Sequence, residues 1–243
     1  MSEPARIIPL DEIDSTNLEA RRRLEAGEAP PFWVTARRQT AGRGRRGRAW
    51  DTSDGNLAAT AMLVTDRPPI EAAQIAFVAA LAVHDLMSAY VGSDLARLKW
   101  PNDTLLAGRK VSGVLVESGA YANGRIWLVV GIGVNLAHAP TGLERPATSL
   151  AAHMTGPPPT PLEAMHRLSE AFDVWRRVWD QEGFSAIAAA WTQRAHGLGA
   201  RCQARLPNET VEGIAEGLDA DGALRLRLDD GALRRITAGD VFF

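Results

Sequence analysis

The sequence has a single cysteine, Cys202, among its 243 residues. One thiol can form neither an intramolecular disulfide nor a cluster of cysteine metal ligands. The composition therefore excludes a disulfide-stapled secreted domain and a zinc–cysteine module. We interpret Cys202 as a reduced thiol in a cytosolic protein, and the sequence indicates no metal site built by the protein alone.

Long hydrophobic runs are also missing. The longest apolar run, residues 75–83, is too short and too rich in alanine to span a bilayer. Residues 1–4 show neither the basic segment nor the apolar segment of a signal peptide. We therefore expect a cytoplasmic protein that does not act at a membrane.

An excess of either charge is absent as well. The chain has 27 basic and 29 acidic residues, a formal net charge of −2, and 46% hydrophobic residues, which is an ordinary globular profile. Proteins that bind nucleic acid in bulk are usually basic overall. The length of the chain suits one large domain, or a domain with an appendage. The positive charge must therefore be local, which favours a small anionic ligand over a long polyanion.

That local charge lies in residues 39–50. Six arginines fall between residues 37 and 48, and no acidic residue occurs between Glu28 and Asp51. Glycines alternate with the arginines, so neither helix nor strand is favoured and the backbone can approach a ligand closely. Each guanidinium presents a fork of donors that matches phosphate or carboxylate oxygens. The loop alone fits a polyanionic small ligand and a nucleic-acid arm or solvated basic loop equally well.

The surroundings of this loop exclude two common nucleotide sites. Residues 32–36 and 56–64 read as strands on either side, whereas a P-loop joins a strand to a helix, and no GxxxxGK[ST] motif occurs. Gly131 and Gly133 mimic part of a dinucleotide fingerprint. Leu136 stands where the third glycine belongs and no helix pattern follows, so we reject a Rossmann fold.

Two helix starts carry capping-box spacing. Thr16 and Glu19 open a helix that runs to about residue 26, and Thr160 and Glu163 open another. For residues 15–17, spacing favours capping over the alternative that free N–H groups and hydroxyls bind a polar ligand.

The rest of the chain alternates between helix and strand patterns. Residues 71–90 have helical periodicity, while residues 98–134 carry turn signals and β-branched runs spaced as in a meander of strands. Beyond residue 197, short alternating runs are separated by Asp221-Gly222 and Asp230-Gly231, which favour hairpin turns. This last segment predicts a small β appendage that packs on the main domain, since it is too small to be very stable alone.

Five sequence blocks, in order and at fitting spacings, resemble the biotin protein ligases (biotin–[acetyl-CoA-carboxylase] ligases). They are residues 15–17 (Ser-Thr-Asn), Gln39 with residues 42–50 (Gly-Arg-Gly-Arg-Arg-Gly-Arg-Ala-Trp), residues 99–103 (Lys-Trp-Pro-Asn-Asp), residues 110–117 (Lys-Val-Ser-Gly-Val-Leu-Val-Glu) and residues 131–135 (Gly-Ile-Gly-Val-Asn).

The resemblance implies an α+β fold of the class II aminoacyl-tRNA synthetase and biotin ligase type, with a mixed β-sheet packed with helices. It implies a catalytic domain over residues 1–196 and a small SH3-like β-barrel over residues 197–243. Some members carry an N-terminal winged helix-turn-helix that represses biotin operons. Because the Ser-Thr-Asn block begins at residue 15, we expect an enzyme without that role.

The implied reaction activates biotin with ATP to biotinyl-5'-AMP and transfers the biotinyl group to a lysine of a biotin carboxyl carrier protein domain. A carboxylate that attacks an α-phosphate is already ionised and needs no base, and charge repulsion opposes the reaction. Positioned cations and alignment should therefore supply catalysis. This accounts for arginines and a lysine without a Ser/His/Asp triad. ATP chemistry also implies Mg²⁺, although no carboxylate cluster identifies its ligands.

We assign Lys110 as the bridge between the biotin carboxylate and the α-phosphate, and Arg45 as the clamp that closes over the intermediate. For biotin, the matching residues are Ser15, Thr16, Asn17, Gln39, Gly42, Arg43, Gly44, Arg45, Lys110 and Gly113. For ATP and the adenylate they are Arg45, Arg46, Arg48, Trp50, Asn102, Lys110 and Asn135.

Two alternatives remain. A lipoate or octanoate ligase or transferase shares the fold and the lysine, but it differs at the loop, with fewer arginines and a His-Asp pair after it. A nucleic-acid-binding module is disfavoured by the net charge and by the lack of interleaved aromatic residues. The sequence leaves open whether the protein is a monomer or a homodimer.

Overall fold

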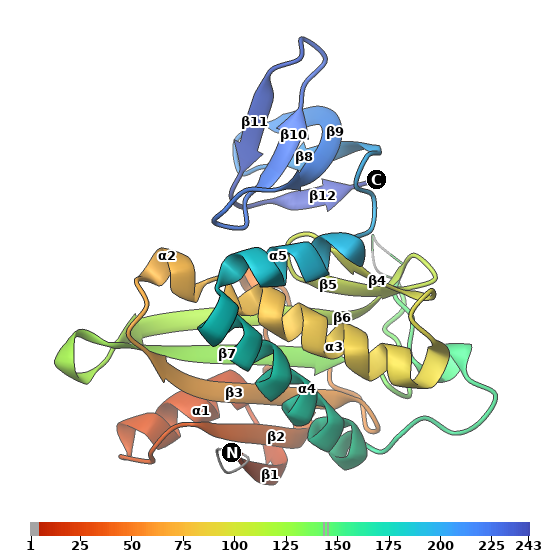
Figure 1. The fold of residues 1–243 in the computed structure, drawn as a ribbon. Coiled ribbons are helices and arrows are strands. Elements are labelled where there is room, and N and C mark those ends of the chain that lie inside the picture. Colours follow the sequence, from red (N-terminus) through yellow and green to blue (C-terminus); the bar gives the residue numbers. More distant parts are fainter. Residues whose placement is uncertain (1–4, 143, 145) are drawn as a thin grey trace.

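A seven-stranded mixed sheet forms the main body of the protein (Figure 1). The computed structural model describes residues 5–142, 144 and 146–243, so the segment examined for a signal peptide, residues 1–4, lies outside the described residues. The strands follow the order β1-β2-β3-β7-β6-β5-β4 across the sheet. They are β1 (Arg6–Ile13), β2 (Phe32–Gln39), β3 (Leu57–Thr65), β4 (Ala96–Lys99), β5 (Asp103–Leu106), β6 (Arg109–Ala120) and β7 (Ile126–Val134).

The sheet is parallel only between β1 and β2, and its other neighbouring strands are antiparallel. The long strands β3, β7 and β6 lie at its centre, with Gly113 of β6 opposite Gly133 of β7. The turn at residues 100–102 joins β4 to β5 as a hairpin. The α+β class with a mixed sheet is confirmed.

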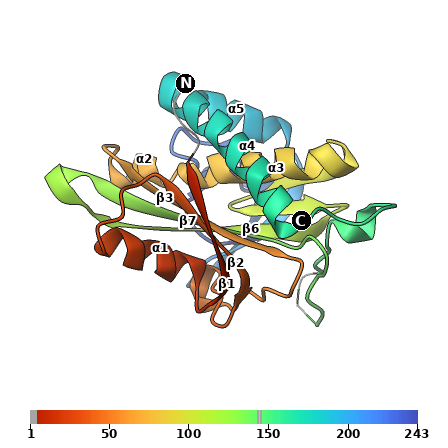
Figure 2. The same ribbon diagram turned by 90° about the horizontal axis from the view of Figure 1, so that it is seen from below.

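Helices cover both faces of this sheet unequally (Figure 2). The helix α1 (Thr16–Glu25) lies on one face, and α3 (Ile75–Val91), α4 (Pro161–Glu182) and α5 (Phe184–Gln193) lie on the other, with the short α2 (Pro69–Ala72) before α3. The core between them is closely packed: the rings of Trp33 and Phe172 meet edge to face at 5.2 Å between centroids. Nearly every residue in the middle of α3 is buried, because the sheet covers one side and α4 the other.

The helical stretch Pro69–Val91 is long and apolar enough to cross a membrane. The apolar run at residues 75–83, which lies within it, was too short by itself. The most apolar window of the whole stretch, however, is 72% buried inside the protein. A core helix gives the same pattern, and its apolar surface is already covered by protein.

The two expected capping boxes have different outcomes. At α4, the Glu163 N–H donates to the Thr160 hydroxyl at 3.3 Å and the Thr160 N–H donates to the Glu163 carboxylate at 2.8 Å, so the box is confirmed. At α1 the prediction is wrong. Ser15 is the N-cap without a side-chain bond, and Glu19 instead pairs with Arg22. The Thr16 hydroxyl bonds to groups on neighbouring strands, which removes it from capping.

A second, five-stranded antiparallel sheet follows α5. Its strands are β8 (Arg201–Arg205), β9 (Thr210–Leu218), β10 (Leu224–Arg227), β11 (Leu233–Ile236) and β12 (Asp240–Phe242), in the order β11-β10-β9-β8-β12. The hairpin turns at Asp221 and Asp230 are present, each with its carboxylate accepting from a backbone N–H two residues on. The sheet fits the expected SH3-like domain, but β11 and β12 do not pair among the described residues, so no closed barrel forms.

The two sheets are joined by buried contacts. The Trp100 indole N–H donates to the Gly222 carbonyl at 3.0 Å. A Cβ on Gly222 would lie 2.7 Å from the ring of Phe77 on α3, and Trp191 on α5 packs against that ring, edge to face at 5.6 Å between centroids. The link after α5 also bonds to β4 at Leu98, which extends the large sheet. The small sheet is thus packed onto the large one.

We expect Trp191→Ala to lower the free energy of unfolding by about 3–5 kcal/mol, because it empties a fully buried aromatic site against Phe77, the ring that contacts Gly222 at this junction. Urea unfolding followed by tryptophan fluorescence and circular dichroism measures the change. Val174→Ala on α4 is the control, since Val174 is 48% exposed and its loss should cost about 0.5 kcal/mol or less. A loss below about 1 kcal/mol for Trp191→Ala would show that the junction contributes little to stability.

Candidate functional site

A cavity of about 590 Å³ lies where α1, the arginine loop, β6, β7 and the turn at residues 100–102 converge. Most residues singled out in the sequence line it: Ser15, Thr16, Asn17, Gln39, Arg43, Gly44, Arg45, Arg48, Trp50, Asn102, Lys110, Gly113 and Asn135. Gly42 and Arg46 are not among the lining residues. Gly42 packs against the Trp50 backbone, and Arg46 faces Asp240. Segments far apart in the sequence therefore build one site.

Glycines form the floor of this cavity. A Cβ on Gly133 would come within 2.2 Å of the Trp50 indole, and one on Gly131 would lie 2.3 Å from the Asn17 Oδ1 atom. A Cβ on Gly113 would lie 3.2 Å from the Lys110 Nζ atom. These positions lack side chains because Trp50, Asn17 and Lys110 occupy the space above the strands.

The end of the cavity beneath α1 is a buried network of neutral polar groups. The backbone N–H and hydroxyl of Thr16 both bond to the Gln39 Oε1 atom, at 2.9 and 3.0 Å. The other half of that amide, Nε2, donates to the Thr52 hydroxyl at 2.9 Å. The Thr60 hydroxyl lies 2.9 Å from the Thr16 hydroxyl. Each group fixes the orientation of the next, so the network is a preorganised surface for an uncharged polar ligand.

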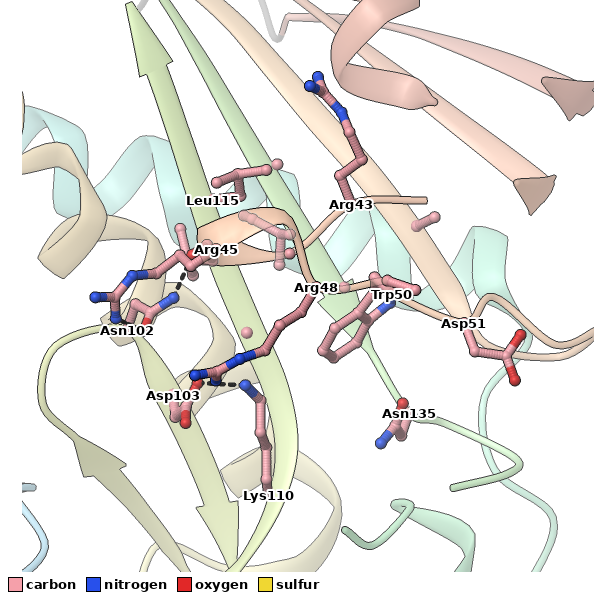
Figure 3. A pocket seen from close by; sticks show the side chains of 18 of the residues that line it. Arg43, Arg45, Arg48, Trp50, Asp51, Asn102, Asp103, Lys110, Leu115 and Asn135 are labelled. Atoms are coloured by element: carbon pink, nitrogen blue, oxygen red, sulfur yellow. Dashed lines mark hydrogen bonds and ion pairs between the residues drawn. The ribbon is translucent and has the colours of Figure 1, made fainter. Parts of the chain in front are cut away.

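Glu117 holds two of the predicted site residues. Its carboxylate accepts from the Asn17 Nδ2 atom at 2.7 Å and lies 3.3 Å from the Arg43 guanidinium. The Thr60 hydroxyl donates to the opposite end of the Asn17 amide at 2.7 Å. Asn17, 3% exposed, is therefore fixed in one orientation. Arg43 is held on this side, and Figure 3 shows it pointing away from Arg45 and Arg48.

The arginine loop folds back on itself. The Gly44 N–H donates to the Arg48 carbonyl at 2.7 Å, and the Trp50 N–H donates to the Gly42 carbonyl at 2.9 Å. Between them, Arg46 adopts a left-handed backbone with φ of 58° inside a 3₁₀ turn (Arg45–Gly47). Few non-glycine residues adopt this conformation. This turn directs successive arginine side chains toward different partners.

Three of these arginines contact the C-terminal sheet. Arg45 donates to the Asn102 Oδ1 atom at 2.8 Å and to the Gly239 carbonyl at 3.1 Å. Arg46 lies 3.3 Å from the Asp240 carboxylate, and Arg48 also pairs with it. Burial lowers the pKa of the Arg45 guanidinium from its ordinary value. The first residue of β12 thus opposes the charge of the loop at the edge of the cavity.

Lys110 lies at the start of β6, inside the cavity (Figure 3). Its Nζ atom is 2.6 Å from the Asp103 carboxylate and 5.7 Å from the centre of the Trp50 ring. The backbone of Lys110 pairs with the segment at residues 146–148. Asn135, 2% exposed, donates from Nδ2 to the Thr148 carbonyl at 3.1 Å and so supports the same segment.

Sequence reasoning missed three acidic residues at this site. Asp103 and Glu117 stand inside the recognised blocks, and their acidic character beside so many cations was a usable signal. Asp240 had no such signal, because it lies near the end of the chain and is brought to the loop only by the fold. No group of three or more His, Cys, Asp or Glu side chains suited to a metal ion occurs in the described part of the chain.

Comparisons with known proteins agree with the geometry. Residues 9–135 match the biotin/lipoate A/B protein ligase family, and residues 197–243 match the biotin protein ligase C terminal domain. The chain is 44% identical over 240 residues to a biotin–[acetyl-CoA-carboxylase] ligase of Paracoccus denitrificans, covering 96% of this chain and 99% of the relative. It is 31% identical to a bifunctional ligase/repressor BirA of Bacillus spizizenii, covering 97% of this chain and 73% of that protein.

A solved structure shares the architecture. The biotin protein ligase of Aquifex aeolicus in complex with biotin and ATP superimposes with a TM-score of 0.80 at 26% identity, covering 98% of this chain and 97% of that one. The expected resemblance is therefore confirmed over nearly the whole length. The chain belongs to the biotin protein ligases of the biotin/lipoate A/B protein ligase family.

Proposed function

We propose that this protein activates biotin with ATP to biotinyl-5'-AMP and transfers the biotinyl group to a lysine of a carboxylase acceptor protein. The observation that carries the proposal is the continuity of the cavity. A neutral polar network beneath α1 suits an uncharged head group, and the arginine loop suits phosphates. Lys110 lies within the same cavity. The protein is an ATP-dependent ligase.

The chemistry requires little beyond charge and alignment. The biotin carboxylate attacks the α-phosphorus of ATP, pyrophosphate leaves, and a mixed anhydride forms. Both reactants are anionic, so a fixed ammonium between them stabilises the transition state more than the separated reactants. Lys110 is suited to this because its ammonium lies near the Gly113 floor, where the ion pair with Asp103 at 2.6 Å positions it.

The remaining roles follow from position. In our proposal biotin is held by eight residues: Ser15, Thr16, Asn17, Gln39, Gly42, Arg43, Gly44 and Gly113. Arg45 closes over the intermediate. Five further residues hold the nucleotide, or position the residues that hold it: Arg46, Arg48, Trp50, Asn102 and Asn135. In the acyl transfer, the same cations stabilise the departing AMP.

Further partners follow from the reaction. We propose that Mg²⁺ arrives with ATP and is held mainly by phosphate oxygens, as is usual for this ion. Asp103 is one of the carboxylates that line the cavity and could contact it. The acceptor would be a biotin carboxyl carrier protein domain. We place the enzyme in the cytoplasm, as a monomer or homodimer. The boundary between its two domains would lie between residues 196 and 197, in the link from α5 to β8.

Biotin-dependent ATP–pyrophosphate exchange by the purified chain tests the function. We expect exchange with biotin and none with lipoate, because a lipoate-specific site belongs to the other branch of the family. Exchange that depends on lipoate alone would overturn the proposal in favour of a lipoate ligase, and exchange with neither acid would exclude both.

Lys110→Ala should lower the rate of adenylation roughly 10²–10³-fold at saturating biotin and ATP, as loss of a preorganised charge stabiliser does. Arg109→Ala is the matched control, since Arg109 is exposed at the preceding position and should leave the rate unchanged. Circular dichroism verifies folding of both variants. A rate near that of the wild type for Lys110→Ala would exclude the bridging role.

Arg45→Gly should still form biotinyl-5'-AMP but release it early. Its guanidinium bridges the loop to Asn102 and Gly239, and its loss removes about 1.5–3 kcal/mol of charge-assisted bonding, or roughly 10–100-fold in retention. Biotin transfer to an unrelated lysine-rich protein, at enzyme and ATP concentrations matched to the wild type, measures the release. If the variant makes no adenylate, or retains it as tightly as the wild type, Arg45 is not the clamp and Arg46 or Arg48 becomes the candidate.

The loop should be cut by trypsin at Arg43–Arg48 more slowly when biotinyl-5'-AMP is bound, because ligand binding stabilises the closed loop. In the free enzyme, Asp240→Asn should speed cleavage roughly two- to thirtyfold, since it removes two ion pairs worth roughly 0.2–1 kcal/mol each. Asp229→Asn is the control, because Asp229 pairs with Arg201 in the small sheet instead. Equal cleavage with and without adenylate would contradict loop closure, and no effect of Asp240→Asn would contradict the tether.

A further inference from the structure

The chain is almost free of lysine. Lys99 and Lys110 are the two lysines among 27 basic residues, and the other 25 are arginines. Ion pairs on the outer surface that would serve equally well with lysine use arginine instead, as in Arg201–Asp229 and Arg234–Glu209. Since an exposed ion pair contributes little with either cation, stability does not require this preference.

Both lysines lie at or beside the cavity. Lys110 lines it and is paired with Asp103 at 2.6 Å. Lys99 ends β4, is half-buried, and has its Nζ atom 5.9 Å from the centre of the Phe242 ring, which also lines the cavity. Apart from these two, no ε-amine exists anywhere on the chain.

The chemistry of the intermediate gives this absence a meaning. In biotinyl-5'-AMP, the nitrogen of an uncharged ε-amine attacks the acyl carbon and forms an amide. The bond from that carbon to the phosphate oxygen breaks, AMP leaves with the electron pair, and the amine loses a proton. A guanidinium stays protonated and does not compete in this reaction. The remaining soft nucleophile, Cys202, is 4% exposed, and burial raises the pKa of its thiol.

We propose that this enzyme resists modification by its own activated intermediate, because arginine takes the place of lysine over its surface. The inference rests on the proposed function. It adds a determinant of acceptor selectivity: released adenylate meets no competing ε-amine on the outer surface of the enzyme and reacts with the acceptor or with water. Lys110 is kept because the reaction uses its ammonium, which is paired with Asp103 at 2.6 Å.

Arg205 marks the place where a lysine would be acylated first. It is 47% exposed, pairs with Glu144 at 3.3 Å and lies over the Phe242 ring at 4.4 Å, and both partners line the cavity. Arg234 offers a matched comparison. It is 41% exposed and paired with Glu209, but it lies on β11, at the opposite edge of the small sheet from β12.

Intact-mass spectrometry with peptide mapping on the wild type, Arg205→Lys and Arg234→Lys tests the proposal in two arms. In the first arm, synthetic biotinyl-5'-AMP is added to each folded protein without ATP, beside cytochrome c as a lysine-rich standard. In the second arm, each protein receives biotin and ATP without acceptor, so that adenylate can come only from the enzyme. Peptide mapping separates ε-amine products from acylation of the N-terminal amine.

We expect the wild type to gain little biotin at its ε-amines in either arm while cytochrome c is labelled, because Lys110 is paired with Asp103 and Lys99 is half-buried. In the first arm both variants should gain biotin at the new lysine at similar rates. In the second arm Arg205→Lys should exceed Arg234→Lys about tenfold, since a lysine beside the cavity meets adenylate while the enzyme still holds it, at a higher effective concentration than free adenylate.

Labelling of the wild type at the rate of cytochrome c, or variants that stay unlabelled in the first arm, would overturn the proposal. Equal labelling of the two variants in the second arm would show that position 205 does not lie on the exit path, and it would overturn the proposal. Failure of the proposed function is distinguishable, because absence of labelling in the second arm alone, together with absence of pyrophosphate exchange, shows that no adenylate is made.

Discussion

Repulsion between like charges is the constraint on which the site depends. Four arginines fall within six residues of the loop, and two unit charges 4 Å apart repel by about 1 kcal/mol in water and about 4 kcal/mol near a protein surface. The loop can lie over the cavity only if acidic or carbonyl groups oppose that charge. Glu117 of β6 forms an ion pair with Arg43, and Asp240 of β12 forms ion pairs with Arg46 and Arg48. The Gly239 carbonyl accepts a hydrogen bond from Arg45. Glu117 holds Arg43 apart from the other three arginines, which Gly239 and Asp240 hold at the edge of the C-terminal sheet.

This arrangement makes the C-terminal sheet part of the site. It is too small to be very stable alone, and its attachment through Trp100 and Gly222 places Asp240 against the loop. Trp100 belongs to the same short turn as Asn102, whose Oδ1 atom accepts a hydrogen bond from Arg45. The turn therefore fixes the small sheet and one wall of the cavity together. A change in the packing of that sheet should reach the arginine-loop end of the cavity through these two contacts.

The sequence allowed the local features to be predicted, because their causes are local. Turn residues, the Thr160 cap, the strand and helix periods and the arginine loop depend on neighbours within a few positions, and the five recognised blocks identify the family. What failed depends on distant partners. Thr16 has the spacing of a helix cap, but its hydroxyl forms hydrogen bonds with Gln39 and Thr60, which lie 23 and 44 residues away in the sequence. The strands β8 and β12 were not anticipated, because β12 is three residues long and pairs only with β8. Asp240 reaches its arginines across more than 190 residues, and no pattern in the sequence records that contact.

The floor of the cavity shows why the site can dispense with a general base. Gly113 and Gly133 face each other across β6 and β7, and their bare backbone leaves space that Trp50 and Lys110 occupy from above. A ligand that runs from the polar network beneath α1 to the arginine loop must cross this floor, so its carboxylate would pass beside the Lys110 ammonium. In the reaction we propose, the nucleophile is already ionised and guanidinium groups would stabilise the leaving pyrophosphate, so no proton has to move in the first step. The same cations that favour formation of the anhydride would also bind it. Synthesis and retention of the intermediate are therefore one electrostatic property of the cavity, and selectivity in the second step depends on which amine first reaches the acyl carbon.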